Sequence, residues 1–186
     1  MSFDHFGFIA PIFSRVGYSS LDEMIEHADL PTSGRVLDAG GGTGRVAKVI
    51  REHAGEVVIA DPSLGMLHEA DQTQLKLACS NSEALPFPND TFERIIMVDA
   101  LHHVIHQGET AREMYRVLKP GGRIVIEEPD IRRFGVKLIA VAEKLLLMRS
   151  HFLSPNKIVD LFSFDSAEKS IHATEGNAWV VIEKPK

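Results

Sequence analysis

The chain of 186 residues alternates between two hydrophobic patterns, and that alternation predicts strands separated by helices. Short apolar runs are typical of strands buried in a parallel sheet, and we expect them at 36–38, 57–60, 76–80, 92–98 and 123–129. Helical spacing of apolar residues predicts helices at 21–28, 43–53, 109–118 and 156–162. Two further expected strands, at 167–174 and 178–183, form a closing hairpin. These elements predict an α/β fold with a mostly parallel sheet and helices on both faces.

A glycine turn follows the first expected strand. Asp38 ends that strand, glycines follow at positions 40, 42 and 44, and a helix opens near Thr43. Glycine adopts backbone angles that are closed to other residues, so a ligand can lie against bare backbone. The unpaired N–H groups of the first helical turn favour a negative group there. Together these features predict a nucleotide-type cofactor site.

The spacing of the glycines distinguishes between cofactors. Dinucleotide-binding chains use G-x-G-x-x-G, whose wider last gap accommodates pyrophosphate. Here D-A-G-G-G-T-G resembles motif I of the class I S-adenosylmethionine (SAM)-dependent methyltransferases. The resemblance implies that SAM binds and that S-adenosylhomocysteine is the product, with the acidic residue near the SAM ammonium group. It assigns the following residues of this motif to the cofactor site: Asp38, Gly40, Gly42, Thr43 and Gly44.

The second expected strand ends at an acidic residue, Asp61. An acid at this position is well placed to accept hydrogen bonds from both ribose hydroxyls, and we favour that role. The other interpretation is a turn or helix N-cap, because Pro62 and Ser63 follow directly. Met66 lies on the next helix, where it packs either on adenine or in the core. We assign Asp61, Pro62 and Met66 to the cofactor site.

The segment N-S-E-A-L-P-F-P-N-D-T-F-E at 81–93 resembles a stretch of the methyltransferases of the ubiquinone/menaquinone-biosynthesis type. In those proteins the first polar pair contacts the adenine edge. The resemblance therefore assigns Asn81 and Ser82 to the cofactor site. Asn81 stands where the family pattern has aspartate, and its amide still offers a carbonyl oxygen to the adenine amino group.

The fourth expected strand ends at D-A-L-H-H-V-I-H, at 99–106. Ligands bind at the carboxyl ends of parallel strands, so Asp99, His102 and His103 are candidate catalytic residues that face the sulfonium and the acceptor. Asp99 is also assigned to the cofactor site. A buried, hydrogen-bonded histidine is an equally good interpretation of this run. We predict no metal site with His106, because adjacent histidines diverge on a helix and no cysteine supports one.

The segment R-V-L-K-P-G-G-R-I-V-I at 116–126 also resembles these families and includes a tight turn at 119–122. The resemblance implies a Rossmann-like class I methyltransferase fold, with a seven-stranded sheet of order 3-2-1-4-5-7-6 whose strand seven is antiparallel. We expect a single domain over 1–186 without an added substrate domain. Within it, 1–30 forms an N-terminal lid and helices, and 131–163 forms a helical region that shapes the acceptor site. Plain packing of the aromatic-rich N-terminal segment is the alternative to a lid.

The composition of the chain argues against some classes of binding partner. The net charge of -6 argues against a nucleic-acid binder, which usually carries a basic face. One cysteine, Cys79, excludes an internal disulfide and fits a reducing cytoplasm. We see no signal peptide, and the longest apolar segment, at 138–148, is too short for membrane insertion. The sequence leaves a homodimer open.

These observations together predict transfer of a methyl group from SAM to a small-molecule acceptor by in-line displacement. A general base is needed only if the acceptor must lose a proton. The alternative is a non-catalytic SAM-binding or regulatory protein on the same fold. A nicotinamide-dependent dehydrogenase is disfavoured by the narrow glycine spacing.

Overall fold

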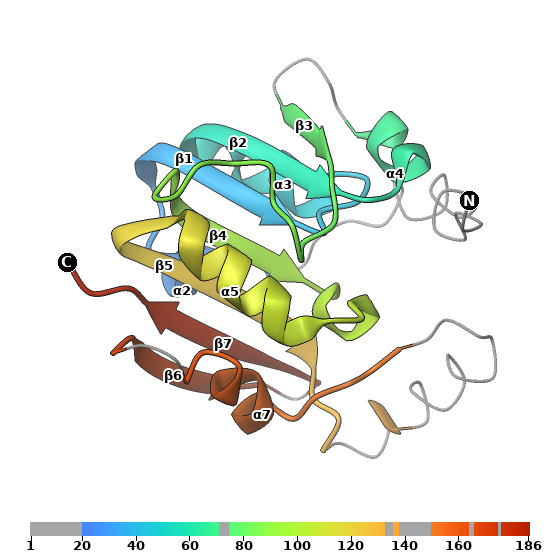
Figure 1. Cartoon of the computed structure of the whole chain (residues 1–186), viewed down its shortest axis with the longest axis vertical. Coiled ribbons are helices and arrows are strands. Elements are labelled where there is room, and N and C mark those ends of the chain that lie inside the picture. The colour runs from blue at the N-terminus through green and yellow to red at the C-terminus, as the bar shows by residue number, and fades with distance from the viewer. Residues whose placement is uncertain (1–19, 71–74, 133–135, 138–149, 164–165, 175) are drawn as a thin grey trace.

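A computed structural model describes residues 20–70, 75–132, 136–137, 150–163, 166–174 and 176–186. Among these residues, seven strands form a sheet in the order β3-β2-β1-β4-β5-β7-β6, which confirms the predicted order (Figure 1). The strands are β1 (Thr32–Ala39), β2 (Ala54–Asp61), β3 (Lys76–Cys79), β4 (Phe92–Val98), β5 (Leu118–Pro129), β6 (Glu168–Ala173) and β7 (Asn177–Glu183).

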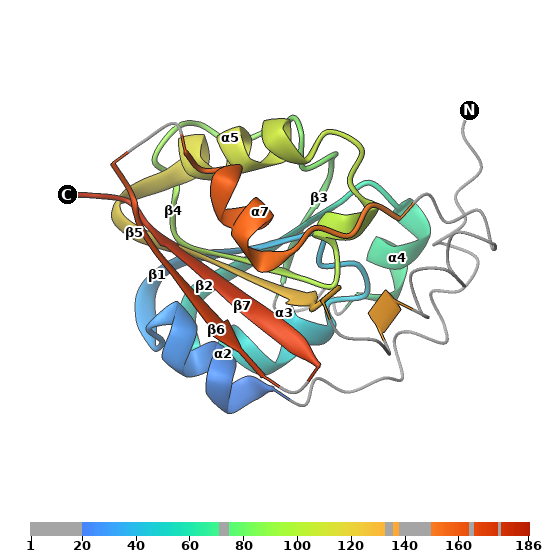
Figure 2. The ribbon, with the colours of Figure 1, turned by 90° about the horizontal axis from the view of Figure 1, so that it is seen from below.

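Helices cover both faces of the sheet, as predicted. Figure 2 shows α5 and α7 on one face and α2 and α3 on the other. The helices are α2 (Leu21–Ala28), α3 (Arg45–Ile50), α4 (Leu64–Glu69), α5 (Gln107–Val117) and α7 (Pro155–Asp160), with 3-10 turns η1 (Arg51–His53) and η2 (Leu101–His103). The helix expected at 43–53 therefore begins two residues later and ends in a 3-10 turn.

Strand pairing places the carboxyl end of β1 between its two neighbours. β1 pairs in parallel with β2 and with β4, while β7 is antiparallel to β5 and β6. The expectation of a separate turn at 119–122 needs correction, because β5 already begins at Leu118. Phe92 pairs with Leu118 and Arg94 pairs with Arg123, so the K-P-G-G residues bulge out of a strand that continues on both sides.

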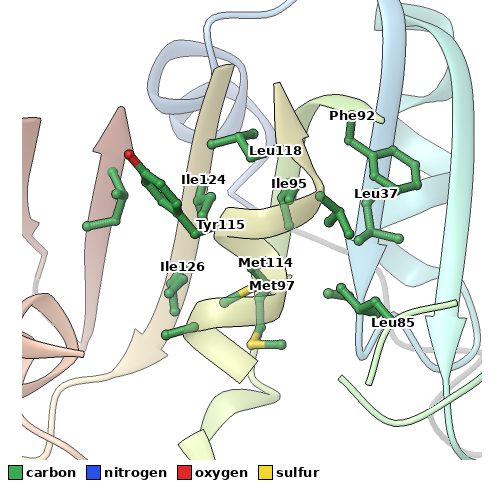
Figure 3. Close-up of a cluster of buried hydrophobic side chains, with 14 of the residues drawn as sticks. Leu37, Leu85, Phe92, Ile95, Met97, Met114, Tyr115, Leu118, Ile124 and Ile126 are labelled. Carbon is green, nitrogen blue, oxygen red and sulfur yellow. The ribbon is translucent and has the colours of Figure 1, made fainter. Parts of the chain in front are cut away.

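Two apolar clusters hold the helices on the sheet. On the α5 face, Met114 of α5 lies over Met97 of β4 (Figure 3). Leu85, from the loop before β4, belongs to the same cluster. The other face is formed by side chains of α2, α3 and α4 against β1, β2 and β4. Each fully buried side chain of this size contributes roughly 1.5–3 kcal/mol relative to exposure, so these layers fix the sheet edge that carries the site.

Parts of the expected lid and acceptor region fall outside the described residues, among them the short stretch at 133–135. The aromatic-rich segment at 1–19, expected as a lid, is one of them, although α2 confirms the helix at 21–28. The apolar segment at 138–148 also lies outside them. Within the described residues, no helix is both long and apolar enough to span a bilayer.

Candidate cofactor and active site

The carboxyl ends of β1, β2 and β4 lie at one edge of the sheet, beside α4 and η2 (Figure 1). The chain leaves β1 toward β2 and β3 on one side and then returns to β4 on the other. The strand order therefore reverses between β1 and β4. Open α/β sheets bind their ligands in the crevice at such a point.

The glycine turn after β1 is built by positive backbone angles. Gly40, Gly42 and Gly44 have φ values of 72°, 52° and 74°. L-residues with a side chain pay roughly 1–2 kcal/mol in this left-handed region, which explains the glycines. The Gly40 N–H donates to the Ala60 carbonyl at 2.7 Å, so the turn is fastened to the end of β2.

Of these three glycines, only Gly42 lies where an added Cβ atom would make ordinary van der Waals contacts without a clash. A Cβ atom at Gly40 would lie 2.7 Å from Ala100, and one at Gly44 would lie 2.9 Å from Ile59. At Gly42 the nearest atoms are Met66 Sδ at 3.8 Å and Asp61 Oδ2 at 3.9 Å. Gly42 is partly exposed, and it is flanked by two residues that the sequence assigns to the same site.

Asp61 is held against the glycine turn by backbone donors. The Gly42 N–H donates to its Oδ2 at 3.0 Å, and the Ser63 N–H donates to its Oδ1 at 2.8 Å. Ser63 in turn caps α4, because its Oγ accepts from the Met66 N–H at 3.1 Å. Pro62 is exposed between them. Asp61 thus bonds the turn that follows β2, while Ser63 and not Asp61 is the N-cap of α4; its ribose role stays a prediction.

Asp38 lies beneath the glycine turn. Its side chain is 1% exposed, and its Oδ2 accepts from the Ala47 N–H of α3 at 3.2 Å. A Cβ atom at Gly41 would lie 2.5 Å from the Asp38 carboxyl carbon, so the carboxyl packs directly against the turn. Burial raises the pKa of Asp38 to about 7, although the Ala47 bond and Arg45 act in the opposite direction. Thr43, also in the turn, is buried.

The predicted adenine contacts follow β3 at the next position along this edge. Ser82 is buried and Asn81 is exposed. Sequence reasoning did not single out Ser80, whose N–H donates to the Asp61 carbonyl at 3.1 Å. Among the described side chains, the Ser80 hydroxyl is buried without a hydrogen-bond partner. A buried polar group without a partner is rare and fits a site completed by a ligand.

Asp99 follows β4 at the reversal point, and its φ is 50°. Its Oδ2 lies 3.0 Å from Arg45 Nη2, at the start of α3, and the Asp99 side chain is 43% exposed. This ion pair joins the turn after β1 to the turn after β4. Arg45 was not among the predicted site residues, although its position directly after the last glycine was a usable signal.

His102 is a buried partner of a glutamate on β5. Its Nδ1 lies 2.5 Å from Glu128 Oε2, and both side chains are 5% exposed. The ring stacks on Phe152, with centroids 4.3 Å apart and planes at 11°. Sequence reasoning missed Glu128, because the contact joins positions 26 residues apart on neighbouring strand ends.

His103 has a different environment. Its ring centroid lies 4.0 Å from that of His102, and its Nδ1 lies 3.3 Å from the Ser150 hydroxyl. Burial, and then the charge of His102, lower the pKa of His103 to about 3. The ring is therefore neutral at physiological pH. A base works best when its pKa lies near the operating pH, which makes His103 a weaker base than an unperturbed histidine.

The structure also describes the acidic residue that follows β5 and a hollow beside α5. Asp130, after β5, is 2% exposed and accepts hydrogen bonds from the Arg132 guanidinium at 2.7 to 3.1 Å. A hollow of about 500 Å³ lies between the start of α5 and α7, and its lining includes Ile105, Arg112 and Lys157. The lining contains none of the predicted catalytic or cofactor-binding residues. Within the described part of the chain, no three His, Cys, Asp or Glu side chains group as metal ligands would.

Comparison with known proteins supports the fold and the cofactor motif. Residues 37–126 match the family described as "Methyltransferase domain". The ubiquinone/menaquinone biosynthesis C-methyltransferase UbiE of Coxiella burnetii is 40% identical over an alignment of 118 positions, which covers 58% of this chain and 47% of that protein. The chain thus spans about half the length of the curated relatives that it matches.

Solved structures share the architecture across nearly the whole chain. A SAM-dependent methyltransferase of Thermotoga maritima superposes with a TM-score of 0.79 at 22% identity, covering 97% of this chain and 98% of that one. The [4+2]-cyclase SpnF superposes with a TM-score of 0.74 at 16% identity, covering 92% and 85%. At these identities the likeness concerns the fold.

Proposed function

We propose that this chain, which has the class I methyltransferase fold and matches the methyltransferase domain family over residues 37–126, transfers a methyl group from SAM to a small-molecule acceptor. One observation carries the proposal. The partly exposed Gly42 is flanked by Asp61 and Met66, at the edge where the strand order reverses. That arrangement offers backbone, a carboxylate and an apolar thioether side by side.

Each part of this arrangement fits a portion of SAM. The Asp61 carboxylate is an acceptor for the ribose hydroxyls, and its two backbone bonds fix it in place. Met66 is 7% exposed on α4 and offers a polarizable surface for adenine. Asn81, Ser82 and the buried Ser80 hydroxyl supply polar atoms after β3.

We assign two roles to the residues that would surround the amino acid end of SAM: some shape the glycine turn, and others offer charges. Asp38 supports the glycine turn from below through its bond to Ala47, and Thr43 fills the turn beside it. Gly40 and Gly44 give the turn its path. The Arg45–Asp99 pair offers one charge of each sign at the crevice, which suits a zwitterionic amino acid.

The bound cofactor would supply an activated methyl group on a sulfonium, which needs no further activation. The protein then has mainly to align the acceptor, and such positioning contributes roughly 7–11 kcal/mol in favourable systems. Asp99, His102 and His103 stand at the carboxyl end of β4, where the acceptor would lie. Among them, His102 has the environment best suited to receive a proton, because a carboxylate pairs with its ring.

The acceptor class follows from the relatives and from the apolar character of the region at 131–163. The UbiE relative is named for ubiquinone and menaquinone biosynthesis, so an aromatic hydroquinone is the first acceptor to test. Leu153 of this region packs on the core beside α7, close to η2. We propose that residues 131–163, with the N-terminal segment, shape the acceptor site of this single domain.

A transfer assay tests the proposal directly. The protein is incubated with SAM that carries a tritiated methyl group and with a short-chain prenyl hydroquinone, and label in the extracted hydroquinone is counted. We expect transfer by the wild type and a loss of at least tenfold in Asp61→Ala at subsaturating SAM. An exposed variant on α2, Asp22→Ala, is the matched control and should retain the wild-type rate.

A second candidate is a SAM-binding protein without methyl transfer. The [4+2]-cyclase among the structural neighbours is named for a different activity, and one fold can serve many functions. SAM binding without label transfer to the hydroquinone, or to a panel of catechols, amines and thiols, would favour this candidate over the enzyme.

A further inference from the structure

We propose that Glu128 is a positioning residue that orients His102 as the proton acceptor for the methyl acceptor substrate, an inference that rests on the proposed function. Glu128 follows directly after Glu127, which pairs with Val98 at the end of β4. Its side chain therefore lies opposite the loop that leaves β4, the same loop that carries Asp99 and η2.

The Glu128 carboxylate holds that loop through three donors. Its Oε1 accepts from the Ala100 N–H at 3.0 Å and from the Leu101 N–H at 2.7 Å. Its Oε2 lies 2.5 Å from His102 Nδ1. Glu128 is 4% exposed, and burial of a carboxylate is costly unless hydrogen bonds satisfy it. One side chain thus fixes both the backbone of the loop and the histidine on it.

These contacts determine which nitrogen of His102 carries the proton. An ionised carboxylate only accepts hydrogen bonds, so Nδ1 must be the donor to Oε2. In the neutral imidazole the lone pair then belongs to Nε2. Stacking on Phe152 and the bond from the His151 N–H to the His102 carbonyl at 2.6 Å hold the ring and its backbone in place.

The orientation has a defined chemical consequence. When an acceptor O–H or N–H bond breaks, its proton moves to Nε2 of His102 and the electron pair stays on the acceptor atom. Bound SAM would supply the methyl group to which that pair bonds, and the electrons of the broken S–C bond would leave with the sulfur of S-adenosylhomocysteine. His102 becomes an imidazolium, and the Glu128 carboxylate beside Nδ1 balances its charge. General-base assistance of this kind contributes typically 10²–10⁴-fold in rate.

The substitution Glu128→Gln reverses the direction of the hydrogen bond to His102 Nδ1, while the side chain keeps nearly the same size and shape. A glutamine offers one oxygen and one NH₂ group. The oxygen is required by the N–H groups of Ala100 and Leu101, so the NH₂ group faces His102 Nδ1. Nδ1 must then accept, and the proton moves to Nε2, which can no longer act as a base.

The test is ¹⁵N NMR of histidine-labelled, ligand-free protein at pH 8, with His102 assigned through bonds from its backbone. We expect an Nδ1-protonated ring in the wild type and an Nε2-protonated ring in Glu128→Gln. Glu127→Gln is the matched control, since Glu127 is buried on the same strand and accepts from Asn177 instead. Its His102 tautomer should be that of the wild type.

A wild-type His102 that is protonated at Nε2 overturns the proposal without recourse to any variant. An unchanged tautomer in folded Glu128→Gln does the same. With the prenyl hydroquinone, Glu128→Gln should lower kcat by about 100-fold at an unchanged SAM Kd, in keeping with loss of a base. Failure of the wild type to bind SAM would overturn the proposed function and the proton transfer, whereas NMR alone decides the orientation of His102.

Discussion

The buried carboxyl of Asp38 should make the stability of this protein depend on pH in a direction opposite to ordinary acid denaturation. Burial raises the pKa of this carboxyl to about 7 from its ordinary value of 3.8. Because the folded state holds this proton more tightly than the unfolded chain, the contribution of Asp38 to stability is full below about pH 4 and is lost as pH rises toward 7. A pKa difference of this size corresponds to about 4 kcal/mol at most.

The variant Asp38→Asn isolates this effect, because asparagine cannot titrate and its oxygen can still accept from the Ala47 N–H. We expect the free energy of unfolding of the wild type, minus that of the variant, to fall by about 1.4 kcal/mol per pH unit up to pH 7 and to level off above it. Taking the difference cancels the histidines, whose contributions change in the same range.

Urea unfolding followed by circular dichroism at pH 5, 6, 7 and 8 measures that difference. Between pH 5 and pH 7 it should decrease by roughly 2–3 kcal/mol. A difference that stays constant to within about 0.5 kcal/mol, a change smaller than one tenfold step in the equilibrium constant, would show that Asp38 ionises normally and would refute the reasoning.

Three further predictions concern stability and are read from urea unfolding. Gly44→Ala should lower the free energy of unfolding by about 1–3 kcal/mol, because φ is 74° and the new Cβ atom would clash with Ile59. Gly108→Ala is the control: its Cβ atom would meet nothing within 4 Å, so the variant should be neutral or more stable by up to about 1 kcal/mol. Burial lowers the pKa of His27, so the free energy of unfolding of the wild type, minus that of His27→Gln, should decline as pH falls below 6.5, and a difference that does not change with pH would contradict this. Arg116→Ala should cost about 2 kcal/mol, since the guanidinium binds two carbonyls and an amide oxygen of the loop before β4; an unchanged midpoint would contradict this.

The local pattern of apolar residues and glycines was sufficient to predict the strands and the glycine turn. The apolar run at 92–98 coincides with β4, and the three positive φ values fall at the glycines of the motif. These features depend on neighbouring residues, whose hydrophobicity and backbone freedom are visible in sequence. The strand order came from family resemblance, since periodicity alone does not order a sheet.

Long-range contacts account for what the sequence did not show. Glu128 and His102 meet only because β5 pairs with β4, and Arg45 meets Asp99 only because β1 pairs with β4. The pKa of Asp38 likewise depends on tertiary burial, which its neighbours in sequence do not reveal. The K-P-G-G bulge was interpreted as a turn because Pro and Gly favour both structures.

Calorimetric titration of the wild type, Asp61→Ala and Asp22→Ala with SAM, S-adenosylhomocysteine and NADH tests the central claim most directly. We expect SAM and S-adenosylhomocysteine to bind the wild type and Asp22→Ala equally, and to bind Asp61→Ala at least about tenfold more weakly, a loss of about 1.4 kcal/mol. NADH should not bind. Binding of NADH alone, or of none of the three to the wild type, would contradict the assignment of this crevice to SAM.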